Sequence, residues 1–345
     1  MSLSGIGIWV AVRTSRLTRQ IVRIGDRGWH HMRVARGSIE SMRIPPSGEQ
    51  FEIRHGDQRA TIVEVGGAIR EYYAGDRAVL DPFSIDKMAD GAHGNPLVPW
   101  PNRLEDGKYE WDGATLQGAL TEPEKHNAIH GLLRWHNWVA TERDESRVLM
   151  HARIHPQTGY PFILDVSVAY ALTDDGLVVT TTATNLGETA CPYGTGQHPY
   201  LSPGEGLIDE CELQFAAATR IDTDDERQLP TGRVPVAGTD FDFSEPRRVG
   251  DFQMDYAFTD LAREQDGRAY GRLKGADRAT VELWLDENYD FLEVFTGDSL
   301  APERARRGLG CEPMTCAPNA FNSGDGLIRL EPGESYSAVW GVRLR

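Results

Sequence analysis

Residues 164–183 read LDVSVAYALTDDGLVVTTTA and contain two stretches in which apolar and polar side chains alternate. The first covers residues 164–172 and the second residues 177–183, with the turn-forming pair Asp175-Gly176 between them. Successive side chains of a β-strand point to opposite faces, so alternation with a period of two predicts strands with one buried face. This segment therefore predicts β-structure.

The same texture continues from about Ser47 to the last residue. Short alternating stretches end at Gly, Asp, Asn or Pro, and helical periodicity is sustained for more than about two turns only in residues 299–307. Neither a linker nor an internal repeat interrupts the pattern, so we predict an all-β chain that forms one large antiparallel β-sandwich. Further stretches with this alternation are residues 51–54, 60–65, 280–285 and 336–344.

The composition is typical of a chain that buries a substantial core. Of the 345 residues, 40% are hydrophobic and 26% are charged, and no run of about 18 apolar residues predicts a membrane-spanning helix. The formal net charge of −16 repels phosphate backbones and anionic lipids, which disfavours nucleic acid and membranes as partners. The four cysteines, at positions 191, 211, 311 and 316, lack paired CxxC spacing and are too few to staple the chain, so we expect no zinc site and a cytoplasmic location.

Residues 1–43 differ from the rest of the chain in charge. They contain eight Arg but only Asp26 and Glu40 as acids, whereas the remainder is strongly acidic. Neither a basic n-region nor a small-residue cleavage site accompanies the mildly apolar start, so we do not expect a targeting signal. We predict a basic N-terminal extension over residues 1–43 that is not part of the fold, and one β-sandwich domain over residues 44–345.

The loop GNPLVPWPNRL, residues 94–104, is the first candidate for a functional site. Its three prolines restrict the backbone and place Asn102 and Arg103 at the end of a stiff segment. The fork of N–H donors on arginine suits the adjacent oxygens of a polyhydroxylated ligand. The alternative is structural, with Arg103 paired to Glu105 or Asp106.

Two histidines and one glutamate are candidates for proton transfer. His130 precedes Gly131 and His198 precedes Pro199, so each lies in a turn with a constrained backbone. Glu312 lies in an apolar stretch bounded by prolines, where loss of hydration raises the pKa of a carboxyl group. No HExxH spacing accompanies the histidines, so we expect acid and base catalysis on a polar ligand and no metal site. The alternatives are structural histidines and a solvated glutamate.

Six segments form an ordered set of motifs: NPLVPWPNRLEDGKYEWDG (residues 95–113), NAIHGLLRWHNW (127–138), QHPYL (197–201), MDYAFTDL (254–261), FLEVFTGD (291–298) and CEPMTCAPNAFN (311–322). In sequence, order and separation they resemble the aldose 1-epimerase (galactose mutarotase) family, over roughly residues 47–345. The resemblance implies a large antiparallel β-sandwich with a sugar site in a cleft on the concave face of one sheet. It also implies the family's reaction, which interconverts the α and β anomers of an aldose.

The resemblance also assigns roles to individual residues. The glutamate of the block CEPMT, Glu312, matches the family's general base, and His198 of the block QHPYL matches its general acid. Four further residues match positions that bind the sugar, namely His130, Arg103, Asn102 and Asp255. Gln197 and Pro199 stand where many family members have Asn and a small residue, so the identity of the sugar stays open.

The chemistry explains these residue types. A cyclic hemiacetal opens when an acid protonates its ring oxygen and a base takes the proton of the anomeric hydroxyl. No group or electron leaves the sugar, so we expect no cofactor and a small sugar as the partner. An aromatic side chain such as Trp100 is a candidate to stack on the sugar. The oligomeric state stays open.

Two other functions remain as alternatives. A 1-epimerase for a hexose phosphate or another acidic sugar would need extra cations at the cleft, for which Arg134 and Arg153 are available, although the net charge of −16 disfavours an anionic substrate. A non-catalytic carbohydrate-binding or sensing protein with the same fold would not need both His198 and Glu312.

Overall fold

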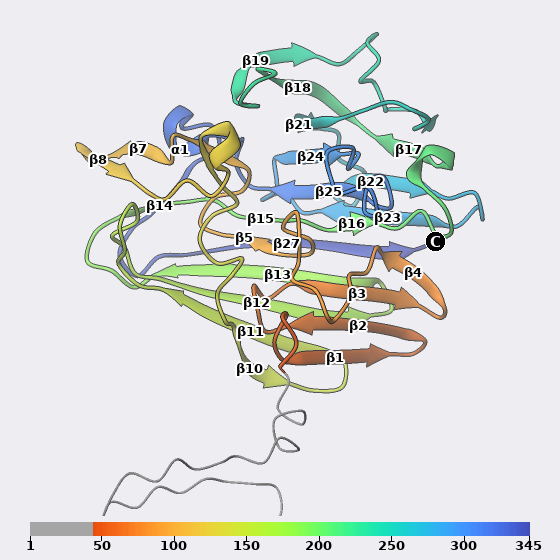
Figure 1. Ribbon diagram of the computed structural model, residues 1–345, viewed down its shortest axis with the longest axis horizontal. Coiled ribbons are helices and arrows are strands. Elements are labelled where there is room, and N and C mark those ends of the chain that lie inside the picture. Colours follow the sequence, from red (N-terminus) through yellow and green to blue (C-terminus); the bar gives the residue numbers. More distant parts are fainter. Residues whose placement is uncertain (1–43) are drawn as a thin grey trace, which may run out of the picture. The chain divides into compact units, whose positions relative to one another are not determined.

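The computed structural model describes residues 44–345, and most of these residues lie in antiparallel β-strands (Figure 1). The predicted all-β fold with large antiparallel sheets is confirmed. The predicted basic extension, residues 1–43, lies outside the described residues and stays a prediction.

The first sheet has 12 strands. Its main path runs β1-β2-β3-β4-β16-β25-β24-β21-β18-β19, and β15 pairs with both β25 and β5. The strands are β1 (Gln50–His55), β2 (Gln58–Val63), β3 (Ile69–Ala74), β4 (Arg77–Leu80), β5 (Pro96–Leu97), β15 (Gly196–Gln197), β16 (Tyr200–Leu201), β18 (Ala217–Thr223), β19 (Pro230–Pro235), β21 (Asp255–Leu261), β24 (Phe291–Phe295) and β25 (Leu309–Met314).

The second sheet has nine strands in the order β10-β11-β12-β13-β27-β23-β22-β17-β20. The segment quoted at the outset forms β12 and β13, which are joined by a tight turn where Thr173 pairs with Gly176. The strands are β10 (Val139–Arg143), β11 (Arg147–Ile154), β12 (Leu164–Thr173), β13 (Gly176–Asn185), β17 (Glu212–Phe215), β20 (Arg247–Arg248), β22 (Ala269–Lys274), β23 (Thr280–Leu285) and β27 (Ser335–Leu344).

Short elements complete the described chain. They are the strand pairs β14 (Cys191–Tyr193) with β26 (Ile328–Leu330), β6 (Arg103–Glu105) with β9 (Asn127–Ile129) and β7 (Lys108–Trp111) with β8 (Ala114–Gln117), the 3₁₀ turns η3 (Pro123–Lys125) and η4 (Ile208–Glu210), and the one-turn helix α1 (Ala320–Ser323). The helical periodicity of residues 299–307 does not give a helix. Those residues form turns, and Arg306 adopts a φ of 59°, which a right-handed helix excludes.

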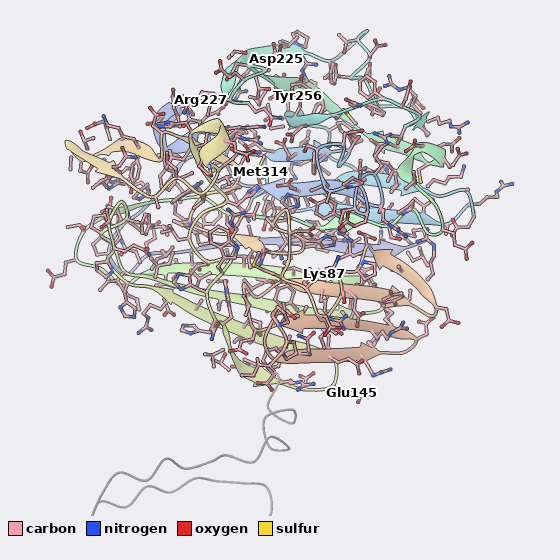
Figure 2. The ribbon with its side chains drawn as sticks, viewed as in Figure 1. Lys87, Glu145, Asp225, Arg227, Tyr256 and Met314 are labelled. Atoms are coloured by element: carbon pink, nitrogen blue, oxygen red, sulfur yellow. The ribbon has the colours of Figure 1, made fainter. Side chains whose placement is uncertain are left out.

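The main core lies between the two large sheets. Phe51 and Ile53 of β1 and Val166 and Val168 of β12 belong to one cluster of buried apolar side chains, and β1 contacts β12. Burial of one such side chain contributes about 1.5–3 kcal/mol, so the alternation along β12 holds this strand in a single register. In Figure 2, Met314 lies in the interior, whereas the exposed residues Glu145 and Asp225 lie at opposite edges of the view.

Strand β25 differs from most strands because all six of its residues are buried. Leu309 and Cys311 belong to the core between the sheets. Since side chains alternate along a strand, Gly310, Glu312 and Met314 point to the opposite face. A carboxyl group is thereby held on a buried surface outside the apolar core.

The described chain contains no helix with the length and apolarity needed to cross a bilayer.

Candidate functional site

All six side chains selected from the sequence line a single cleft. Its volume of about 270 Å³ is near the lower end for small-molecule pockets, about 300 Å³. The six are Asn102, Arg103, His130, His198, Asp255 and Glu312, and the cleft is completed by side chains that include Thr121, Glu122, Arg134, Tyr200, Phe295 and Leu300. Segments distant in the sequence therefore meet at one polar surface, and the roles of the six residues remain predictions.

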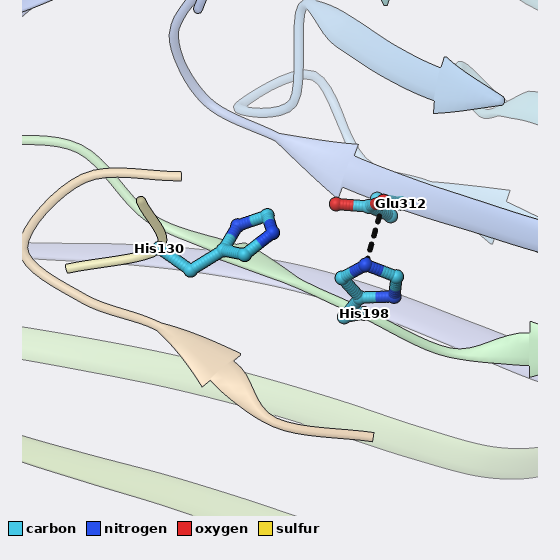
Figure 3. A group of neighbouring side chains, drawn as sticks. All are labelled: His130, His198 and Glu312. Atoms are coloured by element: carbon cyan, nitrogen blue, oxygen red, sulfur yellow. Dashed lines mark ion pairs between the residues drawn. The ribbon is translucent and has the colours of Figure 1, made fainter. Parts of the chain in front are cut away.

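The strand register places His198 beside Glu312. Tyr200 of β16 pairs with Gly310 of β25, and the pairing is antiparallel, so His198 falls opposite Glu312. On the other side of β25, Glu293 of β24 pairs directly with Glu312. These three side chains form a row across the sheet. Nε2 of His198 lies 3.1 Å from Oε1 of Glu312 (Figure 3).

The backbone of His198 is fixed on both sides. Its N–H donates to the carbonyl of Asn95 at 3.0 Å, and its carbonyl accepts from the N–H of Gly94 at 2.8 Å. Pro199 then restricts the following peptide, as its position in the sequence predicts. The imidazole stacks on the ring of Tyr200, with centroids 4.9 Å apart and an interplanar angle of 21°. His198 is therefore held in one orientation.

His130 is positioned by an unusual backbone. It adopts a φ of 60°, and the next residue, Gly131, adopts 68°. A Cβ at Gly131 would lie 2.1 Å from the carbonyl oxygen of Val98, so only glycine fits there. Nδ1 of His130 accepts from the backbone N–H of Asn102 at 3.2 Å. A neutral His130 therefore carries its proton on Nε2.

Arg103 is paired, although with neither partner considered from the sequence. Its Nε donates to Oε2 of Glu122 at 3.0 Å and its Nη2 to Oε1 of the same carboxylate at 3.1 Å. Nη2 also lies 3.8 Å from Oδ2 of Asp255. The alternative pairing with Glu105 or Asp106 does not form, because the pairing of β6 with β9 brings the loop that precedes β9 over the guanidinium.

Burial sets the protonation of the central pair. Loss of hydration raises the pKa of Glu312 well above its ordinary value, and the charge of Asp255 raises it further. Loss of hydration lowers the pKa of His198 to about 3, and the charge of Arg134 acts in the same direction. Both shifts favour uncharged groups. Together the two shifts favour a neutral carboxyl group beside a neutral imidazole over an ion pair.

Glu293 is a buried neighbour of Glu312 that sequence reasoning missed. It is 2% exposed, and its Oε2 has no hydrogen-bond partner among the described residues. Burial raises its pKa well above the ordinary value, and the charges of Asp255 and Glu312 act in the same direction. The signal in the sequence was a single acid inside the apolar run FLEVF. These effects favour the protonated form of Glu293 beside Glu312.

The aromatic surface of the cleft also differs from the expectation. Trp100 is buried against Phe321, with ring centroids 5.4 Å apart, and is not part of the cleft lining, so it is a core residue. Tyr200 and Phe295 supply the aromatic lining instead. Tyr200 lies in the quoted motif QHPYL, but the sequence alone did not show that its ring faces the imidazole.

His130, His198 and Glu312 also have the composition of a metal site, since one ligand atom of each lies within 4.8 Å of the others. The hydrogen bond at His130 opposes this use. A metal at Nε2 would require the proton on Nδ1, which would then face the N–H donor of Asn102. Metal-bound histidines instead direct their second nitrogen to an acceptor. The geometry therefore fits proton transfer better than metal binding.

The protonated state of Glu293 predicts an unusual pH dependence of stability. The native state keeps the Glu293 proton above pH 4.3, approximately where an unfolded glutamate loses it, so this residue lowers stability as the pH rises. Glu293→Gln removes that effect. The melting temperature of the variant relative to wild type should therefore rise between pH 5 and pH 8.

Glu282→Gln is the matched control. Arg272 and Arg343 bond Glu282 and lower its pKa, so the native and unfolded states are both ionised above pH 5, approximately, and its difference from wild type should stay flat. A flat difference for Glu293→Gln as well would mean that Glu293 is ionised in the native protein.

Comparisons with known proteins identify the family of this chain. A family model described as aldose 1-epimerase matches residues 49–343. The uncharacterized protein YihR of Escherichia coli (strain K12) is 33% identical over 300 residues, which cover 86% of this chain and 93% of that protein. The aldose 1-epimerase of the same organism is 24% identical over 306 residues, covering 79% and 84%. The solved GalM/aldose epimerase homologue from C. elegans shares the fold, with a TM-score of 0.77 at 18% identity over 86% of this chain and 98% of that one. This chain belongs to the aldose 1-epimerase family.

Proposed function

We propose that this protein is an aldose 1-epimerase, which interconverts the α and β anomers of an aldose by acid- and base-catalysed ring opening and closure. One observation carries the proposal. His198 and Glu312, both buried, lie 3.1 Å apart in a polar cleft. The pair is proposed to share one proton, which is what a reaction with one acid and one base requires. Membership of the aldose 1-epimerase family supports the same reaction class.

In the proposed reaction, the anomeric carbon and its two oxygens enter between the two groups. Glu312 accepts the proton of the C1 hydroxyl, His198 donates a proton to the ring oxygen, and the bond between C1 and the ring oxygen breaks to give the open-chain aldehyde. Rotation about the C1–C2 bond presents the other carbonyl face, and the reverse transfers close the ring. Sugar hydroxyls that donate to Glu312 stabilise its charged form and so favour transfer of the shared proton to His198.

The remaining residues are proposed to bind and orient the sugar. The Nε2–H of His130 is a donor for a sugar oxygen, because Nδ1 is occupied by the backbone of Asn102. Arg103 and Asp255 present a donor and an acceptor side by side, which suits adjacent hydroxyl groups.

General acid and general base catalysis each contribute about 10²- to 10⁴-fold, and this is sufficient because the reaction also proceeds in water. No cofactor is needed. The four cysteines are free and buried, which fits the proposed cytoplasmic location.

The main competing function is a carbohydrate-binding protein without turnover. Such a protein would gain nothing from a buried acid and base, because burial of ionisable groups costs free energy that sugar binding does not require. The pair therefore favours the enzyme.

Removal of either member of the pair should abolish most turnover. Glu312→Gln keeps the shape of the side chain but cannot accept the proton, so kcat should fall by about 10²-fold or more, while sugar affinity changes by less than about tenfold. His198→Asn should behave alike, and the double variant should fall short of the product of the two effects. Anomer exchange measured by NMR at saturating sugar gives these values.

His151→Asn is the control, because His151 lies on β11 beside Asp165 and outside the cleft. If Glu312→Gln exchanges anomers like wild type, the base is misassigned. If wild type binds sugars but exchanges none of them, the non-catalytic function is correct.

The pH profile of kcat/KM should be a broad bell. Activity falls on the acid side when the pair gains a second proton, and on the alkaline side when it loses the shared one. Burial lowers the pKa of His198 and raises that of Glu312. The plateau should therefore extend below and above the interval between the ordinary values, about 4.3 for Glu and 6.5 for His. A plateau confined to that interval would mean that the pair is solvated.

Activity should survive exhaustive chelation. The reason is the donor that faces Nδ1 of His130, which opposes metal binding at Nε2. Exchange is measured after dialysis against EDTA, with metal content checked by elemental analysis. Loss of activity that a divalent ion restores would make His130, His198 and Glu312 a metal site.

A further inference from the structure

Arg134 is a cation in the cleft that the proposed mechanism does not use. It lines the same cleft as Glu312 and follows His130 by four residues, in the turn before β10. The backbone of this turn is fixed, because the N–H of Leu132 donates to the carbonyl of Val98 at 2.7 Å and the N–H of Gly66 donates to the carbonyl of His136 at 2.8 Å. The backbone around Arg134 is therefore held in a fixed position.

The two arginines of the cleft differ in their partners. Arg103 is bonded to Glu122 and lies near Asp255, so its charge is balanced. Arg134 forms no ion pair within the described chain, and its buried Nε has no hydrogen-bond partner there. Glu122 is the acid whose charge acts on Arg134, but both of its oxygens are already bonded to Arg103.

The guanidinium of Arg134 is available to bind an anionic group at its edge. Its Cζ lies 4.1 Å from the ring centroid of Trp135, so one face is stacked and the N–H groups at the edge stay available. Burial lowers its pKa to about 10, so it stays charged at neutral pH. A half-buried charge without a counterion is unfavourable, and an anion supplied by a ligand would remove that cost.

The charge of Arg134 is also close to the reacting groups. After burial, it contributes to the lowered pKa of both His130 and His198. In a cleft of about 270 Å³, a group bound by Arg134 is thus within the length of one sugar from the acid and base. Arg153, the other cation considered from the sequence, is bonded to Asp165 on the second sheet and does not line the cleft.

We infer that the aldose carries an anionic substituent, a sulfonate, phosphate or carboxylate away from the anomeric carbon, and that Arg134 binds it. This inference rests on the proposed function. The net charge of −16 does not oppose it, because charges farther away than the screening length, about 8 Å at physiological ionic strength, have little effect inside the cleft. Arg134 thus determines specificity and takes no part in the proton transfers.

The test compares a neutral aldose with its anionic counterparts. Anomer exchange is measured by NMR for glucose, glucose 6-phosphate, glucuronate and 6-deoxy-6-sulfoglucose, which together distinguish the three anions. We expect kcat/KM for at least one anionic sugar to exceed that for glucose by about tenfold or more. In Arg134→Gln, the ratio of anionic to neutral kcat/KM should fall by about 10- to 100-fold. Arg153→Gln should leave both values unchanged.

Arg134→Lys provides a second variant in case Arg134→Gln does not fold, which its melting curve reports. Lysine keeps the charge but loses the fork, so the ratio should fall less than in Arg134→Gln and stay below that of wild type. If wild type exchanges glucose and the ratio does not change in either variant, the inference is wrong and the proposed function stands. If wild type exchanges the anomers of none of the four sugars and of no other aldose, the proposed function is wrong, and the inference about Arg134 is wrong with it.

Discussion

The register between β16, β25 and β24 determines what this protein can do. In antiparallel neighbours, the Cβ atoms of opposite residues lie about 4.5–5.5 Å apart, so the ends of their side chains can contact each other directly. One row of this sheet holds His198, Glu312 and Glu293. A slip of one residue in β25 would turn Glu312 into the apolar core and Cys311 into the cleft. The packing of the core therefore also fixes the position of Glu312 in the cleft.

The electrostatics of the cleft follow from that row. Three carboxyl groups, on Asp255, Glu293 and Glu312, share a poorly hydrated surface with Arg103. Arg103 is bonded to both carboxylate oxygens of Glu122. Its positive charge therefore stabilises the ionised forms of the other carboxyl groups less than the charge of an unpaired arginine would. Burial and the neighbouring carboxyl groups instead raise the pKa of Glu293 and of Glu312, which favours their protonated forms. A hydroxyl group of a ligand could interact with such carboxyl groups as well as with the donors of the cleft.

The sequence predicted the strands well because their alternation is local. Residues 164–183 gave β12 and β13 with their turn, and six widely spaced residues converged on one cleft. What the sequence could not supply depends on non-local register. Glu122 as the partner of Arg103, Glu293 beside Glu312 and the unpaired state of Arg134 become visible only when distant strands are aligned. Trp100 was misplaced for the same reason, since an aromatic residue in a loop motif does not show which face of the loop is buried.

The insertion of β25 between β16 and β24 has a consequence for the folding of the protein. β24 directly precedes β25 in the chain, whereas β16 comes from a much earlier part, so Glu312 meets His198 only after a large chain loop closes. Sheets dominated by such contacts fold slowly, typically in milliseconds to seconds. His198 and Glu312 cannot lie side by side before β16 and β25 have paired. Recovery of the proposed activity during refolding would therefore report closure of the first sheet around β25 rather than the earlier formation of local hairpins such as β12 and β13.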